Sequence, residues 1–251
     1  KNGVDKIRLT GGEPLLRKDF PEIISKLATL ETSLSITTNG ILIDRHIEVL
    51  KQYNVTKINL SLDTLVSEKF HAITLRNQFQ KVIDNLHLLL NHDFKVKVNV
   101  VLIKDFNENE IVDFIKLTEF LPLSIRFIEF MPFAGNEWDR SKMVSQNEIL
   151  SQVENHFLAE NLQKLEDEKN FTARTYKIKG FQGDFGIISS ITNPFCDGCN
   201  RIRLTANGKI KNCLFSNAET DLLTPFRNGE SIEDLISTSI RNKKKVRAGM
   251  N

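Results

Sequence analysis

Three cysteines close together near the end of the chain are the residues best suited to chemistry. The 251-residue sequence has three cysteines in all, Cys196, Cys199 and Cys213. The first two form a C-x-x-C pair, in which one tight turn can point both sulfurs at a single metal ion or cluster. Asp197 and Gly198 between them suit such a turn, because Asp hydrogen-bonds to nearby backbone and Gly has wide conformational freedom. We therefore expect a metal or cluster site here.

A predicted hairpin brings the third cysteine back to the first two. Residues 201–205 and 209–213 have the pattern of two short strands, and Asn207-Gly208 between them favours a type I′ turn. Because the hairpin reverses the chain, Cys213 is expected close to the C-x-x-C turn.

The spacing of the cysteines alone leaves more than one kind of site open. A structural zinc site normally has four ligands, and the sequence offers no fourth cysteine and no histidine nearby. Asp197 or a distant histidine could still complete a zinc site. A redox-active C-x-x-C pair is another alternative, but it leaves Cys213 without a role. Three thiolates on a cubane cluster would leave one iron open to an outside ligand.

The composition is that of an ordinary globular protein, with 26% charged and 40% hydrophobic residues. A net charge of +2 and the lack of a basic face with interleaved aromatic residues give no support to a nucleic-acid or membrane role. No apolar run is long enough for a membrane span, and no signal peptide is visible. The three cysteines are interpreted as free thiols, which are typical of cytosolic proteins, so we expect a cytoplasmic protein. The basic run at residues 241–247 is interpreted as a solvated helix end.

Alternating strands and helices predict an α/β protein of parallel βα units. We expect a partial barrel over residues 1–158, and a C-terminal, mainly β region over residues 159–251 that begins with an exposed polar connection at 159–172. The expected strands lie at residues 7–10, 34–38, 57–62, 95–103 and 124–130. The expected helices lie at residues 19–30, 44–53, 67–71, 78–91, 108–120 and 145–157.

Each predicted strand carries polar residues at alternate positions, which places them on one face of the strand. If helices cover the apolar faces, these polar residues line the solvated lumen of an incomplete TIM-type barrel, whereas an ordinary closed barrel is filled with apolar side chains. The alternative is an antiparallel sheet with one solvent-exposed face. The helices between the strands favour the barrel over this alternative. The predicted lumen residues are Arg8, Thr10, Ser35, Thr37, Asn39, Asn59, Ser61, Asp63, Lys95, Lys97, Asn99, Glu129 and Met131.

Two cations of this set suggest the charge of the ligand. Buried Arg8 and Lys97 would be costly without an anionic partner, so we expect a ligand with phosphate or carboxylate groups. Gly11-Gly12-Glu13-Pro14 follows the first strand, at the end of the barrel where α/β barrels place their sites. Glycines there permit close approach of a ligand to the backbone, and Glu13 could accept a hydrogen bond from an ammonium group.

The order of these motifs resembles that of the radical S-adenosylmethionine GTP 3′,8-cyclases, the MoaA family, which begin molybdenum cofactor biosynthesis. The resemblance covers almost the whole chain, and the cysteine motif is its most specific part. It is carried by residues 7–14 (IRLTGGEP), 37–40 (TTNG), 59–63 (NLSLD), 96–101 (VKVNVV), 125–131 (IRFIEFM) and 196–204 (C-x-x-C-x-R-x-R-L), followed by Cys213.

The resemblance implies cofactors and site residues for this chain. Cys196, Cys199 and Cys213 would hold the second of two 4Fe–4S clusters, whose open iron meets the guanine of GTP. The residues that would contact GTP are Arg8, Thr37, Lys97, Arg201 and Arg203. The residues that would contact S-adenosylmethionine are Gly11, Gly12, Glu13, Ser61 and Met131.

The resemblance also implies a reaction and partners. The family removes a hydrogen atom from the ribose 3′ carbon of GTP, and the carbon radical closes on C8 of guanine to give (8S)-3′,8-cyclo-7,8-dihydroguanosine 5′-triphosphate. Cyclic pyranopterin monophosphate synthase takes this product onward, and family members often form homodimers.

Some family features are absent from the sequence. The first cluster is expected on a C-x-x-x-C-x-x-C segment upstream of Lys1, after a GTP-contacting arginine, and the family ends in a glycine-rich tail. The chain is therefore expected to be a fragment without cyclase activity of its own. Two alternatives remain open: another radical enzyme with an auxiliary cluster, of the peptide maturase type, and a zinc-bearing module without catalysis.

Overall fold

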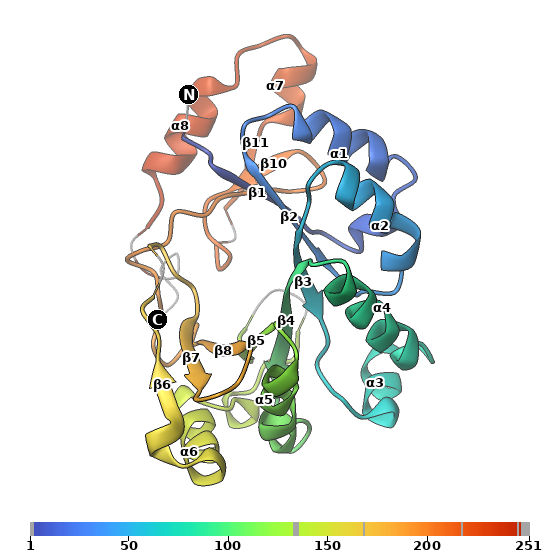
Figure 1. Cartoon of the computed structure of the whole chain (residues 1–251). Coiled ribbons are helices and arrows are strands. Elements are labelled where there is room, and N and C mark those ends of the chain that lie inside the picture. The colour runs from blue at the N-terminus through green and yellow to red at the C-terminus, as the bar shows by residue number, and fades with distance from the viewer. Residues whose placement is uncertain (1–2, 133–135, 168, 217, 245, 247–251) are drawn as a thin grey trace. The chain divides into compact units, whose positions relative to one another are not determined.

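The computed structural model describes residues 3–132, 136–167, 169–216, 218–244 and 246 (Figure 1). The chain forms two compact units. The larger unit comprises residues 3–167 and 173–193, and the smaller comprises the described parts of 168–172 and 194–251.

The larger unit is built on one eight-stranded sheet in the order β1-β2-β3-β4-β5-β8-β7-β6. The first six strands of this order are parallel, and β7 and β6 complete the sheet in antiparallel pairing. The five strands predicted for the barrel are all present, and their parallel arrangement is confirmed. The strands are β1 (Lys6–Leu9), β2 (Ser33–Thr38), β3 (Lys57–Ser61), β4 (Lys95–Leu102), β5 (Ser124–Glu129), β6 (Leu162–Lys164), β7 (Arg174–Ile178) and β8 (Asp184–Ile188).

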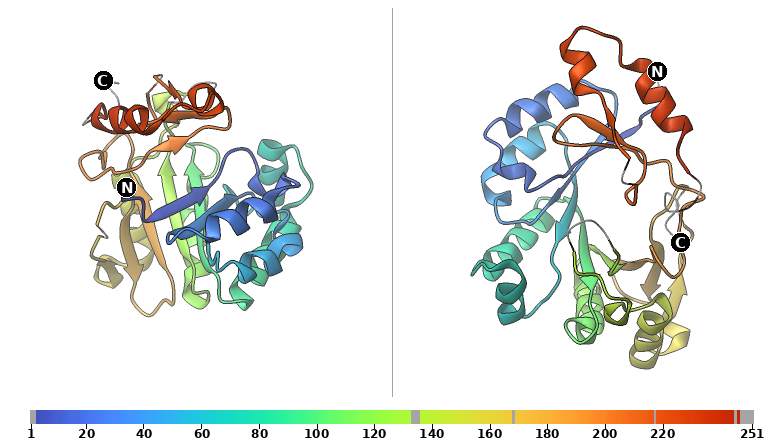
Figure 2. Two further views of the ribbon diagram at one scale, coloured as in Figure 1. Left: turned by 90° about the horizontal axis from the view of Figure 1, so that it is seen from above. Right: turned by 180° about the vertical axis from the view of Figure 1, so that it is seen from behind.

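Helices follow the parallel strands, as expected of βα units. The α-helices are α1 (Phe20–Ala28), α2 (Ile43–Gln52), α3 (Ser67–Thr74), α4 (Phe79–Asn91), α5 (Ile111–Phe120) and α6 (Gln146–Phe157). Short 3₁₀ turns occur at η1 (Pro14–Leu16), η2 (Glu108–Glu110), η3 (Arg140–Lys142) and η4 (Ala159–Asn161). The helices α1 to α4, blue to teal in Figure 2, lie along one side of the sheet. This arrangement is that of a partial barrel.

The core lies between the sheet and the helices α1 to α6. Apolar side chains at alternate positions form rows across neighbouring strands and are buried. One row comprises Leu60, Val98, Ile125 and Phe185, and the next comprises Val100, Phe127 and Ile187. The opposite faces of the same strands carry polar residues together with an apolar row of Val101, Ile128 and Ile188.

The compact units differ from the predicted boundary at residue 158. Residues 173–193 belong to the larger unit, because β8 pairs in parallel with β5 and carries β7 and β6 with it. The stretch 159–172, expected to be an exposed connection, contains η4 and β6. Alternation within single strands does not reveal which strands pair, so the sequence did not indicate this extension of the sheet.

The smaller unit has a three-stranded antiparallel sheet in the order β11-β10-β9. Its elements are β9 (Arg203–Leu204), β10 (Lys209–Lys211), β11 (Thr220–Asp221), α7 (Leu223–Arg227) and α8 (Glu233–Arg241). Of the predicted basic end, Lys245 and Arg247 lie outside the described residues, as does the end of the chain. Within the described ranges, none of the helices has the length and apolar character required to cross a bilayer.

The predicted hairpin is present, but its turn is different. Gly208 has φ +74°, whereas Asn207 is not among the residues with positive φ, as a type I′ turn would require. The N–H of Gly208 donates to the carbonyl of Thr205 at 2.9 Å, and the N–H of Thr205 to that of Lys209 at 2.8 Å. This is a three-residue loop with a left-handed glycine at its end, so Ala206 precedes the Asn-Gly pair within the loop.

Candidate functional site

A row of polar residues crosses five strands of the larger unit, on the face opposite the helix-packed core. The pairing joins Thr37 to Asn59, Asn59 to Lys97, Lys97 to Ser124, and Ser124 to Asp184. Neighbours in register lie on one face of a parallel sheet. The structure therefore brings Thr37 and Lys97, two of the predicted GTP contacts, onto the same polar surface.

Arg8 lies in the next row of this face, toward the amino ends of the strands. It pairs in register with Ser35, and its Nε lies 3.5 Å from the Ser35 hydroxyl. The argument that Arg8 and Lys97 are costly buried cations is wrong, because Arg8 is exposed and Lys97 is only partly buried. Both side chains are therefore at least partly accessible to solvent.

The prediction for the polar face of β5 is wrong. Phe127 is fully buried in the helix-facing core, and Glu129, on the same side of the strand, is also fully buried. The Glu129 carboxylate accepts hydrogen bonds from the N–H groups of Ile191 and Thr192, at 2.8 and 3.0 Å. Met131 follows the end of β5 and is partly buried, so strand alternation does not fix its direction.

The polar face of β5 instead carries Ser124 and Arg126, two positions that sequence reasoning missed. Arg126 Nη1 lies 3.0 Å from Asp184 Oδ1, and the Ser124 hydroxyl donates to the same carboxylate. Gly186 makes room for the guanidinium, since a Cβ there would lie 2.5 Å from Arg126 Nη1. The alternation of Ser124 and Arg126 was visible in the sequence, but Asp184 is joined to them only by the pairing of β5 with β8.

The loop after β1 is held to the end of β2 by Glu13. One carboxylate oxygen accepts from the Thr38 hydroxyl at 2.8 Å and from the Leu15 N–H at 3.1 Å. The other oxygen accepts from the Asn39 N–H at 2.7 Å. Gly11, two residues earlier, is exposed, with φ +123° and open space where a Cβ would stand. The loop thus exposes its backbone at Gly11, while the hydrogen bonds of Glu13 hold it to the end of β2.

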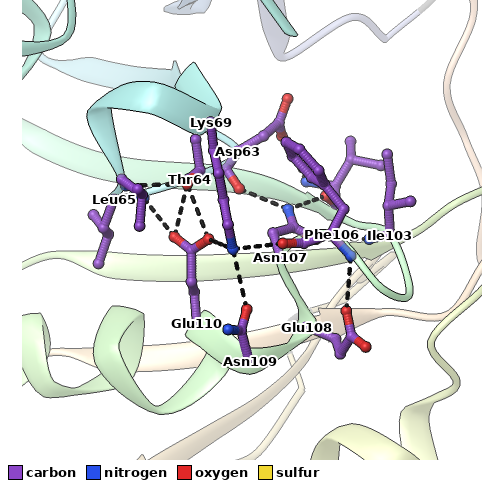
Figure 3. A network of polar contacts seen from close by, with 12 residues as sticks. Asp63, Thr64, Leu65, Lys69, Ile103, Phe106, Asn107, Glu108, Asn109 and Glu110 are labelled. Carbon is purple, nitrogen blue, oxygen red and sulfur yellow. Dashed lines mark hydrogen bonds and ion pairs between the residues drawn. The ribbon is translucent and has the colours of Figure 1, made fainter. Parts of the chain in front are cut away.

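The loops after β3 and β4 are locked together by a polar network (Figure 3). The buried Glu110 carboxylate accepts from the Thr64 hydroxyl at 2.8 Å, from the Leu65 N–H at 2.7 Å and from Lys69 Nζ at 2.8 Å. The Asn107 side chain donates to the Asp63 carbonyl at 2.6 Å. This network fixes the carboxyl ends of both strands.

Two predicted residues lie at this edge. Ser61, the last residue of β3, is exposed. Asp63 accepts from the Val101 N–H at 2.8 Å, and burial raises the pKa of its carboxyl despite that hydrogen bond. Asp63 therefore joins the ends of β3 and β4.

In the smaller unit, the C-x-x-C segment forms the predicted turn, with the Cys199 N–H donating to the Cys196 carbonyl at 3.0 Å. Arg201 Nη2 and Nε lie 3.0 and 3.3 Å from Cys199 Sγ. Burial raises the pKa of the Cys199 thiol, but the hydrogen bonds and charge of Arg201 and the charge of Lys243 outweigh it and lower the pKa to about 7. The environment of Cys199 thus favours the thiolate.

Arg203 lies within electrostatic range of two thiols. Burial and the charge of Arg201 lower the pKa of Arg203, and Cys199 and Cys213 act in the opposite direction. All three cysteines are free thiols and partly exposed. Nearby cations favour the thiolate form of a cysteine, and the thiolate is the form that binds a metal ion or cluster.

In the described part of the chain, no three His, Cys, Asp or Glu side chains converge as ligands of one metal ion. The ligands of a cubane cluster bind separate irons, so they stand farther apart than the ligands of one ion. The free thiols and the cations beside Cys199 fit such a cluster.

Two family models cover nearly all of the chain. Residues 123–248 match the model described as Molybdenum Cofactor Synthesis C, and residues 1–118 match that of the Radical SAM superfamily. The chain is 46% identical to "Molybdenum cofactor biosynthesis protein 1" of Mus musculus over all of its own length, but spans 40% of that relative.

Shorter relatives are covered more fully. The chain is 41% identical to "GTP 3′,8-cyclase, mitochondrial" of Arabidopsis thaliana, covering 99% of the chain and 65% of the relative. It is 38% identical to "GTP 3′,8-cyclase" of Alkaliphilus oremlandii, covering 96% of the chain and 75% of the relative. The structure of Streptococcus suis SuiB bound to precursor peptide SuiA has a TM-score of 0.63 at 14% identity, covering 97% of this chain and 55% of that one. At that identity the likeness concerns the fold alone.

Proposed function

Because the chain belongs to the molybdenum cofactor synthesis family of radical SAM proteins, we propose that it forms the cyclase part of a GTP 3′,8-cyclase. The enzyme converts GTP into its 3′,8-cyclised product, the first step of molybdenum cofactor biosynthesis. The observation that carries the proposal is the 38% identity to a relative of that name, of which the chain covers 75%.

The substrate proposal is GTP, and the residues proposed to contact it are those that the resemblance implies. Thr37 and Lys97 share the polar row of the larger unit, and Arg8 lies on the same face. Arg201 and Arg203 lie beside the thiols of the smaller unit. Guanidinium groups match the geometry of phosphate oxygens, so an arginine suits a contact with the triphosphate.

The cofactor proposal is S-adenosylmethionine and iron–sulfur clusters, which supply the radical chemistry when bound. Gly11 and Gly12 offer exposed backbone to the methionine part of S-adenosylmethionine, with Glu13 securing their loop. The resemblance implies that Ser61 and Met131 also contact S-adenosylmethionine. The second 4Fe–4S cluster is assigned to Cys196, Cys199 and Cys213, and Arg201 beside Cys199 favours the thiolate form of that ligand.

The partners and location remain predictions. We propose that cyclic pyranopterin monophosphate synthase consumes the product and that the protein forms a homodimer. A cytoplasmic location is proposed from the composition, although one relative is named as mitochondrial.

The test is to reconstitute the chain with iron and sulfide without oxygen and to measure iron, zinc and GTP binding. We expect about four irons per chain and GTP affinity that falls at least about tenfold in Arg201→Ala/Arg203→Ala, because charged hydrogen bonds to phosphate are lost. Arg227→Ala, at the exposed end of α7, is the matched control.

A second arm tests the larger unit. Lys97→Met is expected to weaken GTP binding, whereas Lys95→Met, two positions earlier on the same face of β4, is not. Iron binding without GTP affinity would favour another radical SAM enzyme. Stoichiometric zinc that survives reconstitution, with no GTP affinity, would overturn the proposal.

A further inference from the structure

Lys243, two residues after α8, makes three contacts inside the smaller unit. Its Nζ donates to the carbonyl of Arg201 at 2.7 Å and to that of Asn212 at 3.0 Å, and it lies 3.4 Å from Cys199 Sγ. An ammonium group has three donors and no acceptor, so these three acceptors use its full capacity. Lys243 is accordingly partly buried, whereas the following Lys244 is exposed.

The two carbonyls belong to the two segments that carry the thiols. Arg201 follows Cys199 by two residues, and Asn212 immediately precedes Cys213. The segments are also joined by the β9–β10 pairing, in which Lys211 stands opposite Arg203. That pairing ends before the cysteines, so Lys243 joins the two segments beyond the end of the ladder.

A second contact fixes the helix from which Lys243 extends. The Asn212 side chain donates to the Ser239 carbonyl at 2.8 Å. Ser239 lies in the last turn of α8, where backbone carbonyls have no partner within the helix. The end of α8 is thereby held against the strand that leads to Cys213, and Lys243 is kept within reach of both thiol-bearing segments.

We propose that Lys243 is a positioning residue of the thiol site (Cys196, Cys199 and Cys213), which holds together the segments that carry Cys199 and Cys213 so that both thiols can bind one cluster. The cluster itself rests on the proposed function, but the contacts of Lys243 do not. Groups that orient and hydrogen-bond ligands affect binding although they do not bind the metal themselves. Lys243 of the basic run would therefore contribute to the site, whereas the sequence favoured a solvated helix end.

The first test needs no metal. The reduced, metal-free chain is treated with a short bifunctional thiol reagent, and the Cys199–Cys213 cross-link is quantified by peptide mass spectrometry. We expect Lys243→Met to lower its yield severalfold and Lys243→Arg, which keeps charge and donors, to restore much of it. Lys244→Met is the control and should match the wild type. An unchanged yield in Lys243→Met would overturn the proposal.

A second variant covers the case in which Lys243→Met fails to fold. Asn212→Ala keeps the lysine but removes the bond to Ser239, so it should also lower the cross-link yield. Circular dichroism and thermal unfolding show which variants remain folded. If Asn212→Ala is folded and cross-links like the wild type, the helix end does not hold the site and the proposal fails.

Reconstitution separates this proposal from the proposed function. After reconstitution with iron and sulfide, Lys243→Met should retain iron against a chelator about tenfold less well than Lys244→Met. Cross-linking that depends on Lys243 in a chain that binds no iron would keep the positioning role and reject the cluster. Iron retention that is equal in both variants, with equal cross-linking, would keep the cluster and reject the role of Lys243.

Discussion

The Glu13 carboxylate accepts a hydrogen bond from the Asn39 N–H at 2.7 Å and so joins the loops that follow β1 and β2. Through its other oxygen, the same side chain binds the Thr38 hydroxyl and caps the 3₁₀ turn η1. All of these acceptor contacts are made within the chain. Glu13 therefore stabilises the loop of Gly11 and Gly12, whatever it also offers to a ligand.

Replacing Glu13 should destabilise the larger unit. Glu13→Ala leaves the Asn39 N–H and the Thr38 hydroxyl without their acceptor, which should cost about 2 kcal/mol in the free energy of unfolding. Glu22→Ala, which removes a solvent-exposed pair with Lys26 on α1, is the control and should change little. Urea unfolding followed by circular dichroism compares them. Equal midpoints for the two variants would show that Glu13 has no structural role.

The network around Glu110 predicts a larger effect. The Glu110 side chain is 5% exposed and pairs with Lys69, which is 27% exposed. Glu110→Ala leaves the Thr64 hydroxyl and the Leu65 N–H without their acceptor and removes the carboxylate partner of Lys69, so we expect a loss of about 3 kcal/mol. Asp113→Ala, which breaks an exposed pair with Lys116 in the neighbouring α5, is the control. If the two substitutions destabilise the protein equally in urea, the network does not fix the strand ends.

Asp63 gives a prediction for the effect of pH. Burial raises the pKa of its carboxyl in the folded state, although the Val101 N–H acts against the shift. The folded protein thus binds this proton more tightly than the unfolded chain. The corresponding stability is fully present below the unfolded pKa and is lost as the pH rises through the folded pKa.

Asp63→Asn should therefore stabilise the protein at pH 7, because the amide oxygen still accepts from Val101 without carrying a charge. The gain should shrink in acid, where the wild-type carboxyl is protonated. Urea unfolding at pH 7 and at pH 4 measures both. A gain of the same size at the two pH values would contradict the assignment of the effect to Asp63 ionisation.

Sequence patterns predicted the strands well because each strand needs one apolar face against helices. They were less reliable where a side chain depends on a distant partner. Glu129 shares a face with Phe127 and was assigned to the lumen, but it is fully buried and accepts hydrogen bonds from the N–H groups of Ile191 and Thr192. Only the parallel pairing of β5 with β8 reveals this.

At the thiol site, too, sequence patterns predicted the local features but not the contacts between residues that are distant in the sequence. The C-x-x-C turn and the hairpin are local features, so their residues indicated them directly. The contact of Lys243 with Arg201 and Asn212 joins residues that are distant in sequence, and a lysine in a basic run is usually solvated. The loop type was also missed, because Asn207-Gly208 fits both a two-residue loop and the end of a longer one.

Gly208 is expected to be indispensable to the thiol-bearing hairpin. It has φ +74°, and a Cβ there would lie 2.5 Å from the Cβ of Leu223. Gly208→Ala thus combines backbone strain with a clash, and should destabilise the smaller unit by about 3 kcal/mol, compared with about 1 kcal/mol for strain alone.

Gly229→Ala is the matched control for this prediction. Gly229 belongs to the same unit and has φ +77°, but it has open space where a Cβ would stand. The difference between the two alanine variants therefore measures the clash with Leu223 rather than the left-handed backbone. Thermal unfolding of both variants, with the metal-free Cys199–Cys213 cross-link as a second measurement, tests it. Equal stability and equal cross-linking in the two variants would mean that the hairpin moves away from Leu223 without affecting the thiols.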